Sequence, residues 1–330
     1  MKMLKNLLLG SALSGLSTLV LAAGNPLSVH VLNLQDGLPS PGVEVSLEKL
    51  DGERWNKLNE GTTNEQGRIT ALYPEGKKLE SGTYHLTGEL KVERGRDGTA
   101  EAPITMTTAD GKYATLDFGG VGTGFSVWGN YWNISKINIT NTADGAKGMQ
   151  LAGSYCVLEQ MNFYNNGNTG LQVSGLSTDN KALWPSHNTI KNCTSMNNAD
   201  RAMEDADGFA AKLTTGEGNV FDGCIAAYNA DDGWDLFAKA ATGSIGAVTI
   251  QNCVAYKNGY LMLAAEPVKK QSLQFPTVTC DDDGNLSFSN VAVTIAAGNG
   301  NGFKMGGSGI AVNHKVYNSY SFGNAANGFT

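Results

Sequence analysis

Three aspartates lie within five positions in the segment NADDGWDLF, which covers residues 229–237. Asp231, Asp232 and Asp235 would repel one another in a folded chain unless a positive charge lies between them. Carboxylates this close together can bind a metal ion, act as a catalytic pair of acids, or simply form a polar turn. The segment alone leaves these three interpretations open, and the choice depends on the elements that position it.

A repeated pattern surrounds this segment. Short strand-like segments end in asparagine at intervals of 25 to 32 residues, with one longer interval of 66, at Asn141, Asn166, Asn198, Asn229, Asn258 and Asn324. A glycine followed by an apolar residue comes after each of them, at Gly148, Gly170, Gly208, Gly233, Gly302 and Gly328. Two columns that recur together indicate one structural unit repeated along the chain.

Strand-sized units repeated in this way predict a parallel β-helix, in which successive coils stack about 4.8 Å apart. Residues of one column then lie above one another, and stacked asparagines can form hydrogen bonds along the stack. Cys193, Cys224 and Cys253 share a column. We expect them to point into the core as small apolar side chains and to form no disulfides.

The longer interval separates Asn258 from Asn324. It predicts one long loop between coils, over about residues 259–297. Within it, the sequence CDDDGN at 280–285 is expected to form the tip of a hairpin, because strand-like segments flank a DG turn. A second cation site at these aspartates is the alternative.

The glycine column also places aspartates on neighbouring coils. Asp207 and Asp232 directly precede Gly208 and Gly233, so their side chains should stack and point the same way. Asp231 comes immediately before Asp232, at the bend that precedes the strand. The repeat therefore predicts that carboxylates from two coils meet at one place.

A lysine joins the same patch. Two residues after the column glycine, successive coils carry Ala210, Asp235 and Lys304, so Asp235 and Lys304 should be neighbours. One lysine does not balance four carboxylates. Hard oxygen ligands suit Ca²⁺, which takes about 6–8 oxygens, whereas a patch without histidine argues against Zn²⁺ or Cu²⁺. A polar stack that only holds the coils together is the alternative.

The N-terminus has the features of a secretory signal. Lys2 and Lys5 precede an apolar stretch that ends at Ala22 and Ala23. This stretch is short and is broken by serine and glycine, so it predicts export of the protein after removal of residues 1–23 and no membrane anchor. The net charge of −7 and the pI near 5.2 argue against a nucleic-acid-binding surface.

Residues 24–98 differ from the repeats that follow, because they are dense in charge and alternate like antiparallel strands. The stretches NPLSVHVLNLQDGLPSPGVEVSLEKLDG, TTNEQGRITALYPEG and SGTYHL resemble the transthyretin-like hydroxyisourate hydrolases. His30 and Arg68 fall where that family has two of its active-site residues. A second histidine motif and a closing YRGS are missing from the sequence, so we expect a partial β-sandwich without hydrolase activity.

Residues 99–330 resemble the pectate lyases of polysaccharide lyase family nine. The resemblance rests on the stretch from NCTSMNNADRAMEDADGF at residue 192 to CVAYKNGY at residue 260, on GNGNGFKMGG, and on GVGTGFSVWGNYW and NNGNTGLQ. It implies an all-β fold with a right-handed parallel β-helix and Ca²⁺-dependent cleavage of polygalacturonate by β-elimination. The calcium ligands of the family fall on Asp207, Asp231, Asp232 and Asp235, and its catalytic lysine falls on Lys304.

The implied chemistry is consistent with the residues. Ca²⁺ bound to the uronate carboxylate would acidify the C5 proton, which Lys304 would remove as the base. Lys304 must be neutral to do so and an ordinary lysine has a pKa of about 10.4, so we expect an alkaline optimum. Ca²⁺ would also bridge an acidic protein and an acidic polymer.

Two other functions remain open. A polygalacturonase-type glycoside hydrolase could use Asp207 and Asp232, since an inverting pair needs carboxyl groups about 6.5–9.5 Å apart. A non-catalytic β-helix could serve as an adhesin or bind carbohydrate. In each case we expect a monomer that binds neither nucleic acid nor membranes. The chain stops at NGFT, midway through a coil, which predicts a truncated C-terminal end.

Overall fold

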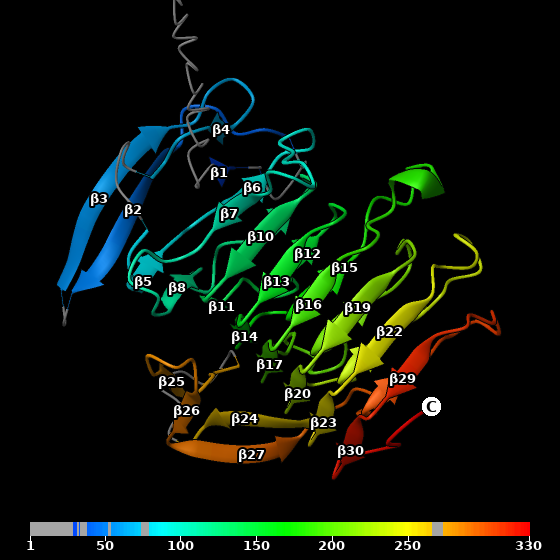
Figure 1. Cartoon of the computed structure of the whole chain (residues 1–330). Helices are drawn as coiled ribbons and strands as arrows, with labels where there is room; N and C mark the ends of the chain where they lie inside the picture. The colour runs from blue at the N-terminus through cyan, green and yellow to red at the C-terminus, as the bar shows by residue number, and fades with distance from the viewer. Residues whose placement is uncertain (1–28, 32, 34–37, 52–53, 74–78, 266–272) are drawn as a thin grey trace, which may run out of the picture.

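The computed structural model describes residues 29–31, 33, 38–51, 54–73, 79–265 and 273–330 (Figure 1). In these ranges the regular structure is β-strand, apart from one short 3-10 helix at Lys181–Leu183. No helix in the described ranges is long and apolar enough to cross a membrane. The predicted signal sequence, residues 1–23, lies outside them.

Three long sheets wind along the chain from the blue N-terminal end to the red C-terminal end (Figure 1). Sheet 1 contains, in spatial order, β28 (Phe303–Lys304), β21 (Trp234–Asp235), β18 (Phe209–Ala211), β15 (Leu171–Val173), β12 (Met149–Leu151), β9 (Gly124–Val127), β6 (Glu89–Val92), β1 (Val29–His30) and β4 (Arg68–Ile69). Sheet 2 contains β29 (Lys315–Tyr317), β22 (Val248–Gln251), β19 (Asn219–Asp222), β16 (Thr189–Lys191), β13 (Val157–Glu159), β10 (Trp132–Ser135) and β7 (Ile104–Met106).

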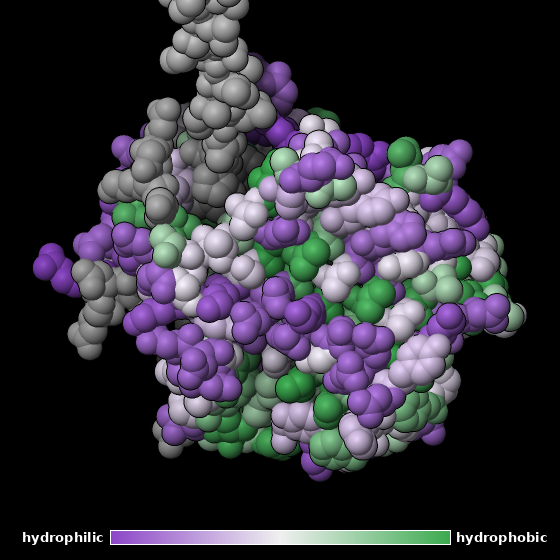
Figure 2. Space-filling model, in the orientation of Figure 1, coloured by the Kyte–Doolittle hydropathy of each residue, from purple (hydrophilic) through white to green (hydrophobic). Residues whose placement is uncertain are grey.

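Sheet 3 contains β3 (Arg54–Thr62), β2 (Glu44–Asp51), β5 (Gly82–His85), β8 (Ala114–Asp117), β11 (Ile137–Thr140), β14 (Asn162–Tyr164), β17 (Thr194–Met196), β20 (Ile225–Ala227), β23 (Val254–Tyr256) and β30 (Tyr320–Phe322). From β5, β6 and β7 onward, each strand pairs in parallel with its counterpart one coil later. This confirms the predicted parallel β-helix. Hydrophilic residues cover much of the face on which sheet 2 lies (Figure 2).

Alternate strand residues point inward and stack in the core. Trp234 is fully buried, with its ring stacked on Phe303 at 4.8 Å and tilted against Phe209 at 5.0 Å. The predicted cysteine column is also confirmed, since Cys193, Cys224 and Cys253 are fully buried and free. Burial of this continuous apolar column is the main force that holds one coil on the next.

The predicted asparagine ladder is confirmed for five members. The side-chain amide of Asn166 donates to the amide oxygen of Asn198 at 2.9 Å. In the same way Asn198 donates to Asn229, Asn229 donates to Asn258, and Asn258 donates to Asn324 at 3.0 Å. The prediction is wrong for Asn141. Strand register pairs Thr140 with Tyr164, so Asn141 is level with Asn165, one residue before the ladder, and donates to Asp117.

The glycine column exists because of this ladder. A Cβ atom on Gly208 would lie 2.7 Å from the amide nitrogen of Asn229 and 2.8 Å from the carbonyl oxygen of Gly233. At Gly233 it would lie 2.6 Å from the carbonyl oxygen of Gly302. A side chain larger than that of glycine does not fit in this space. The asparagine ladder of one coil therefore requires a glycine on the coil before it, which explains why the two columns recur together.

The transthyretin-like segment joins the β-helix through its strands. β2 pairs antiparallel with β3 and β5, while β5 and β6 pair in parallel with β8 and β9. The sheets therefore run across residue 98 without a break, and the division of the chain near that residue stays a prediction. His30 and Arg68 are paired backbone neighbours in β1 and β4, and the Arg68 guanidinium forms an ion pair with Glu93.

Residues expected to form one long loop contain two antiparallel pairs. β24 (Tyr260–Ala264) pairs with β27 (Val291–Ile295), and β25 (Thr277–Cys280) pairs with β26 (Leu286–Ser289) across the expected turn at 280–285. The two ribbons lie beside the coils at the bottom of Figure 1. The Asp282 carboxylate at this turn forms an ion pair with Lys112, 2.9 Å away, and so has a lysine partner without a second Ca²⁺.

Candidate active site

The strand register brings the predicted residues together on sheet 1. β18 pairs with β21 and β21 with β28, so that Ala210, Asp235 and Lys304 are successive partners. Asp207 and Asp232 lie two residues before the first residues of β18 and β21, with the column glycines between. The backbone N–H of Asp232 points to Oδ1 of Asp207, 3.4 Å away, which places the two carboxylates on adjacent coils as predicted.

The four carboxylates are almost completely buried. Asp207 and Asp232 have no exposed surface, and Asp231 and Asp235 are 5% and 3% exposed. One carboxylate oxygen from each of Asp207, Asp231 and Asp232 can be chosen so that all three lie within 4.8 Å of one another. Asp235 lies beside this group and is connected to it by lysine side chains.

Lys304 lies between two of the aspartates. Its Nζ atom is 3.1 Å from Oδ2 of Asp232 and 3.5 Å from Oδ1 of Asp235. These two oxygens are buried, yet neither accepts a well-formed hydrogen bond from the described residues. Both oxygens lie near Lys304 but still have lone pairs that could bind a cation.

Lys212 also belongs to the site, and the sequence reasoning missed it. Its Nζ atom lies 2.6 Å from Oδ2 of Asp207 and 2.8 Å from Oδ2 of Asp235. A signal for it was available, because strand side chains alternate. Two residues after Ala210, position 212 continues the outward row on the coil that carries Asp207.

A ladder of polar side chains fixes the aspartates. The Thr169 hydroxyl lies 3.3 Å from Oδ2 of Asp207, on the coil before it. Oδ1 of Asp232 accepts from both the backbone N–H and the side-chain amide of Asn301, at 3.0 and 2.8 Å. Oδ1 of Asp231 accepts from the backbone N–H of Asn299. The oxygens that remain are directed toward one another and toward the lysines.

Burial dominates the electrostatics of the aspartates. Desolvation raises the pKa of Asp207 well above its ordinary value, against the attraction of Lys212. Desolvation, together with repulsion from Asp232, raises the pKa of Asp231 to about 6. The cluster therefore holds its negative charge at a considerable energetic cost, and a cation would lower that cost.

For the two lysines, attraction to the aspartates outweighs burial and decides the direction of the pKa shift. Burial alone would lower the pKa of Lys304, but Asp235 and Asp232 together raise it. The same balance, with Asp207 and Asp235 as the anions, raises the pKa of Lys212. Both lysines therefore carry a proton at neutral pH when they face the aspartates alone.

The residues present fit a divalent oxygen-binding cation. Four carboxylates and two ammonium groups leave a formal charge of −2, which one such ion would neutralise. Two oxygens bound to one Ca²⁺ at about 2.3–2.6 Å lie no more than roughly 5 Å apart. The carboxylate oxygens of Asp207, Asp231 and Asp232, which lie within 4.8 Å of one another, meet that condition. The unused oxygens of Asp232 and Asp235 supply further capacity.

A cationic side chain lies further along the same column. Lys147 directly precedes Gly148, two coils before Asp207, and contributes with Gln150, Ser126 and Glu89 to a groove of about 410 Å³. Burial, with repulsion from Lys212, lowers the pKa of Lys147. It makes no ion pair with a carboxylate of the described chain.

Comparison with known proteins supports the same interpretation. The family model described as "Pel9A-like, right handed beta helix region" matches residues 75–330, and the HIUase/Transthyretin family model matches residues 27–114. The solved structure titled "Crystal structure of pectate lyase Pel9A" superposes with a TM-score of 0.56 at 30% identity, over 74% of this chain and 54% of that one.

Named relatives are similar over most of this chain. Pectate lyase L of Thermoclostridium stercorarium is 40% identical over 283 residues, which are 85% of this chain and 20% of that protein. Pectate lyase L of Paenibacillus polymyxa is 38% identical over 259 residues, 76% of this chain and 51% of that protein. The N-terminal part is similar to 5-hydroxyisourate hydrolase of Salmonella typhi, with 45% identity over 87 residues.

The chain thus spans about half of one pectate lyase relative and a fifth of the other. Both resemblances seen in the sequence, including the one to the transthyretin family, are confirmed. The family model covers all the parallel coils and every residue of the acidic cluster. The chain belongs to the Pel9A-like right-handed β-helix family.

Proposed function

We propose that this protein is a pectate lyase that cleaves polygalacturonate by β-elimination, with Lys304 as the base. The observation that carries the proposal is the position of Lys304, whose ammonium group lies against Asp232 and Asp235 at the edge of the buried carboxylate cluster. Relatives named pectate lyase, 40% and 38% identical to this chain, support the substrate class.

Asp207, Asp231, Asp232 and Asp235 would hold Ca²⁺ in this proposal. When bound, the ion would supply positive charge next to the uronate carboxylate and so stabilise the negative charge that develops at C5. Lys304 is 22% exposed through its side chain and can reach a bound sugar while it contacts the aspartates. Lys304 would accept the C5 proton, and the C4–O4 bond would then break to leave an unsaturated uronide.

The pH dependence follows from the charge state of Lys304. The aspartates raise its pKa, so it is protonated at neutral pH unless another positive charge lies nearby. A base must be neutral, so turnover should increase as the pH rises into the alkaline range. Lys212 should stay charged, because both of its carboxylate partners lie within 2.8 Å.

Lys147 provides a place for a second carboxylate of the polymer. It is a largely buried cation without an acidic partner among the described residues, and it lies in the groove that continues the column of the acidic cluster. A polymer with a carboxylate on every unit can place one beside the aspartates and another beside Lys147. We therefore assign Lys147 to substrate binding.

The test is release of unsaturated product from polygalacturonate at alkaline pH with Ca²⁺, followed by its ultraviolet absorbance. Lys304→Ala should reduce kcat by about 100- to 10,000-fold, the usual contribution of a general base. Calcium binding by Lys304→Ala, measured by calorimetry, should persist. New reducing ends without ultraviolet absorbance would instead favour a polygalacturonase-type hydrolase, and lack of any turnover would favour a non-catalytic protein.

Export and a monomeric state complete the proposal. The sequence Lys2 to Ala23 supports a cleaved signal. N-terminal sequencing of the protein recovered from a bacterial host should find a start at residue 23 or 24 outside the cytoplasm. Light scattering should give the mass of one chain.

A further inference from the structure

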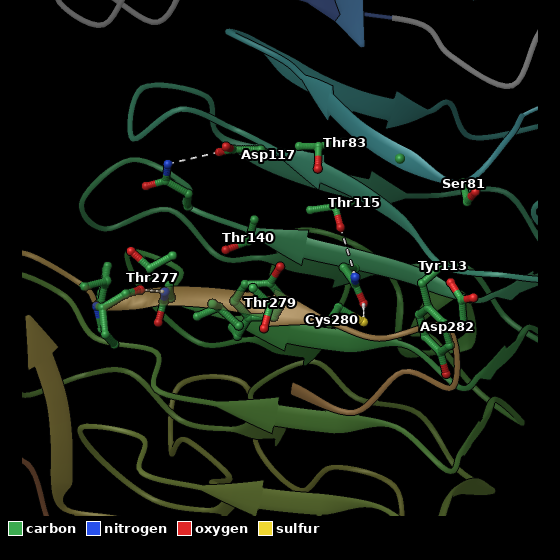
Figure 3. Close-up of a pocket in the computed structure, with 18 of the residues that line it drawn as sticks. Ser81, Thr83, Tyr113, Thr115, Asp117, Thr140, Thr277, Thr279, Cys280 and Asp282 are labelled. Carbon is green, nitrogen blue, oxygen red and sulfur yellow. Dashed lines mark hydrogen bonds between the residues drawn. The ribbon is translucent and has the colours of Figure 1, made fainter. Parts of the chain in front are cut away.

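A second cavity lies on sheet 3, whereas the acidic cluster lies on sheet 1. It has a volume of about 750 Å³ and is bounded by the outer face of β5, β8, β11 and β14 on one side and by β25 on the other (Figure 3). Small-molecule sites typically have volumes of roughly 300–1,000 Å³. The cavity is therefore large enough for several sugar units, and none of the catalytic residues proposed above lines it.

The floor of the cavity consists of polar side chains in two rows, and Asp117 is the one charged residue among those named here. Register places Thr83 next to Thr115, and Thr115 next to Asn138, while Asp117 is next to Thr140. Figure 3 shows the side chains of Thr83, Thr115 and Thr140 on neighbouring strands beside the same space. Because strand residues alternate, every second residue on these strands faces the cavity and the residues between them form the core.

Part of this polar surface is fixed by the protein, and part is left for a ligand. The side-chain amide of Asn138 donates to the Thr115 hydroxyl at 3.0 Å, and Oδ1 of Asp117 accepts from the side-chain amide of Asn141 at 3.0 Å (Figure 3). No described group forms a hydrogen bond with the Thr83 hydroxyl or with Oδ2 of Asp117. Donors and acceptors held in place in this way suit a ligand rich in hydroxyl groups.

Aromatic rings and the hairpin strand form the walls. Tyr113 lies at one end of the cavity in Figure 3, and Thr277 and Thr279 project from β25 toward the floor. Trp55 of β3, which is 44% exposed, and Tyr164 of β14 add further ring surface. Aromatic faces pack against the C–H faces of sugar rings, while the surrounding polar groups bind the hydroxyls.

The charge of the cavity excludes the polymer assigned to the first site. Asp117 and Asp282 are the charged residues among those that line it, and no lysine, arginine or histidine is among them. Lys112 lies at the rim but is already paired with Asp282 at 2.9 Å. A polyuronate would meet two carboxylates here without a free cation, so it should be repelled.

We propose that this cavity on sheet 3 binds an uncharged oligosaccharide, separately from the acidic cluster. The ligand would stack on Trp55 and Tyr113 and form hydrogen bonds with Thr83, Thr115 and Asp117. A site of this kind would hold the enzyme on neutral glycan chains while the other sheet acts on an acidic one. This proposal does not depend on the lyase activity.

The test is direct binding, by calorimetry, of four tetrasaccharides to the full chain in the presence of EDTA: the β-1,4-linked tetramers of glucose, galactose and xylose, and the α-1,4-linked tetramer of galacturonate. We expect at least one neutral tetrasaccharide to bind and tetragalacturonate not to displace it. Trp55→Ala and Thr83→Val should each weaken that binding at least tenfold. Neither change lies in the proposed catalytic machinery, so turnover of polygalacturonate should be unchanged.

Two controls separate binding from folding. Thr83→Val keeps the shape of the side chain and should keep the melting temperature. Lys304→Ala should bind the neutral tetrasaccharide as the wild type does. The proposal is overturned if no neutral tetrasaccharide binds, if tetragalacturonate competes with it, or if both Trp55→Ala and Thr83→Val bind it with unchanged affinity.

Discussion

The ammonium group of Lys212 lies 2.6 Å from Oδ2 of Asp207, a carboxylate without any exposed surface. This pair joins two coils, because the same ammonium group is 2.8 Å from Asp235 on the next coil. Lys212 therefore neutralises part of the negative charge of the cluster. It also repels any cation that enters, so it should set the balance between stability of the fold and affinity for Ca²⁺.

Lys212→Met should separate these two effects. Loss of one partner of a buried ion pair costs about 3–5 kcal/mol, so the variant should melt at a lower temperature in EDTA. Its formal charge in the cluster becomes −3, so Ca²⁺ should bind more tightly and restore more of the melting temperature than in the wild type. Differential scanning calorimetry with and without Ca²⁺ measures both quantities.

Lys239→Met is the matched control for this experiment, since Lys239 is exposed in the loop after β21. It should leave the melting temperature unchanged in EDTA and in Ca²⁺. If Lys212→Met binds Ca²⁺ more weakly than the wild type, Lys212 is a supporting residue of the metal site and our interpretation of it is wrong.

Lys147→Ala should weaken the binding of polygalacturonate without affecting the chemical step. Loss of one charge contact with a partly buried partner should raise KM about tenfold, which corresponds to about 1.4 kcal/mol. The kcat value should change less than twofold, because Lys147 lies two coils from Asp207. Steady-state kinetics with Lys315→Ala, an exposed lysine on sheet 2, as the control would check this. A large fall in kcat with KM unchanged would contradict a binding role.

Loss of an asparagine from the ladder should destabilise the coils. Asn229 is fully buried, donates to Asn258 and accepts from both the backbone and the side chain of Asn198. Asn229→Ala leaves these groups without partners and should cost about 2–4 kcal/mol in the free energy of unfolding. Asn56→Ala, on the exposed face of β3, should change it by about 0.5 kcal/mol or less. Urea unfolding of both variants makes the comparison, and equal losses would argue against the ladder.

Acid should destabilise the end of the helix near His314. Its Nδ1 atom accepts from the backbone N–H of Val248 at 3.1 Å, and burial lowers its pKa from 6.5 to about 4. In the unfolded chain His314 binds a proton below about pH 6.5, whereas the folded protein resists it until about pH 4. Stability from this group is therefore complete above pH 6.5 and is lost as the pH falls to 4, by about 2 kcal/mol given its partial exposure.

The measurement compares the wild type with His314→Asn by urea unfolding at pH 7 and pH 4.5. Burial raises the pKa values of Asp207 and Asp231, which therefore act in the opposite direction, so the difference between the two proteins isolates the histidine. The wild type should lose more stability than the variant between the two pH values. An identical loss would show that His314 does not titrate in this window.

The repeats in the sequence are enough to predict the register of most coils and most of the acidic cluster. Each coil is a local repeat, and a parallel stack turns residues of one column into direct neighbours. The sequence therefore predicts that Asp207 is the neighbour of Asp232, and Asp235 the neighbour of Lys304. The same logic identified the asparagine ladder, but it misplaced Asn141 by one residue. The turn after β11 has the same left-handed residue as later turns, and Thr142, not an asparagine, stands at the ladder position of this coil.

The ion pairs within the cluster depend on the folded structure and not on the repeats alone. The alternation of strand side chains places Lys212 on the outward row. However, its ammonium group donates to aspartates on two different coils, and that geometry depends on the reach of a long side chain. The cavity on sheet 3 likewise required the hairpin β25–β26 to fold back on strands more than 110 residues earlier, for example where the Asn162 amide donates to the carbonyl of Gly284. Repeats specify contacts between adjacent coils, whereas contacts made by an insertion depend on the whole fold.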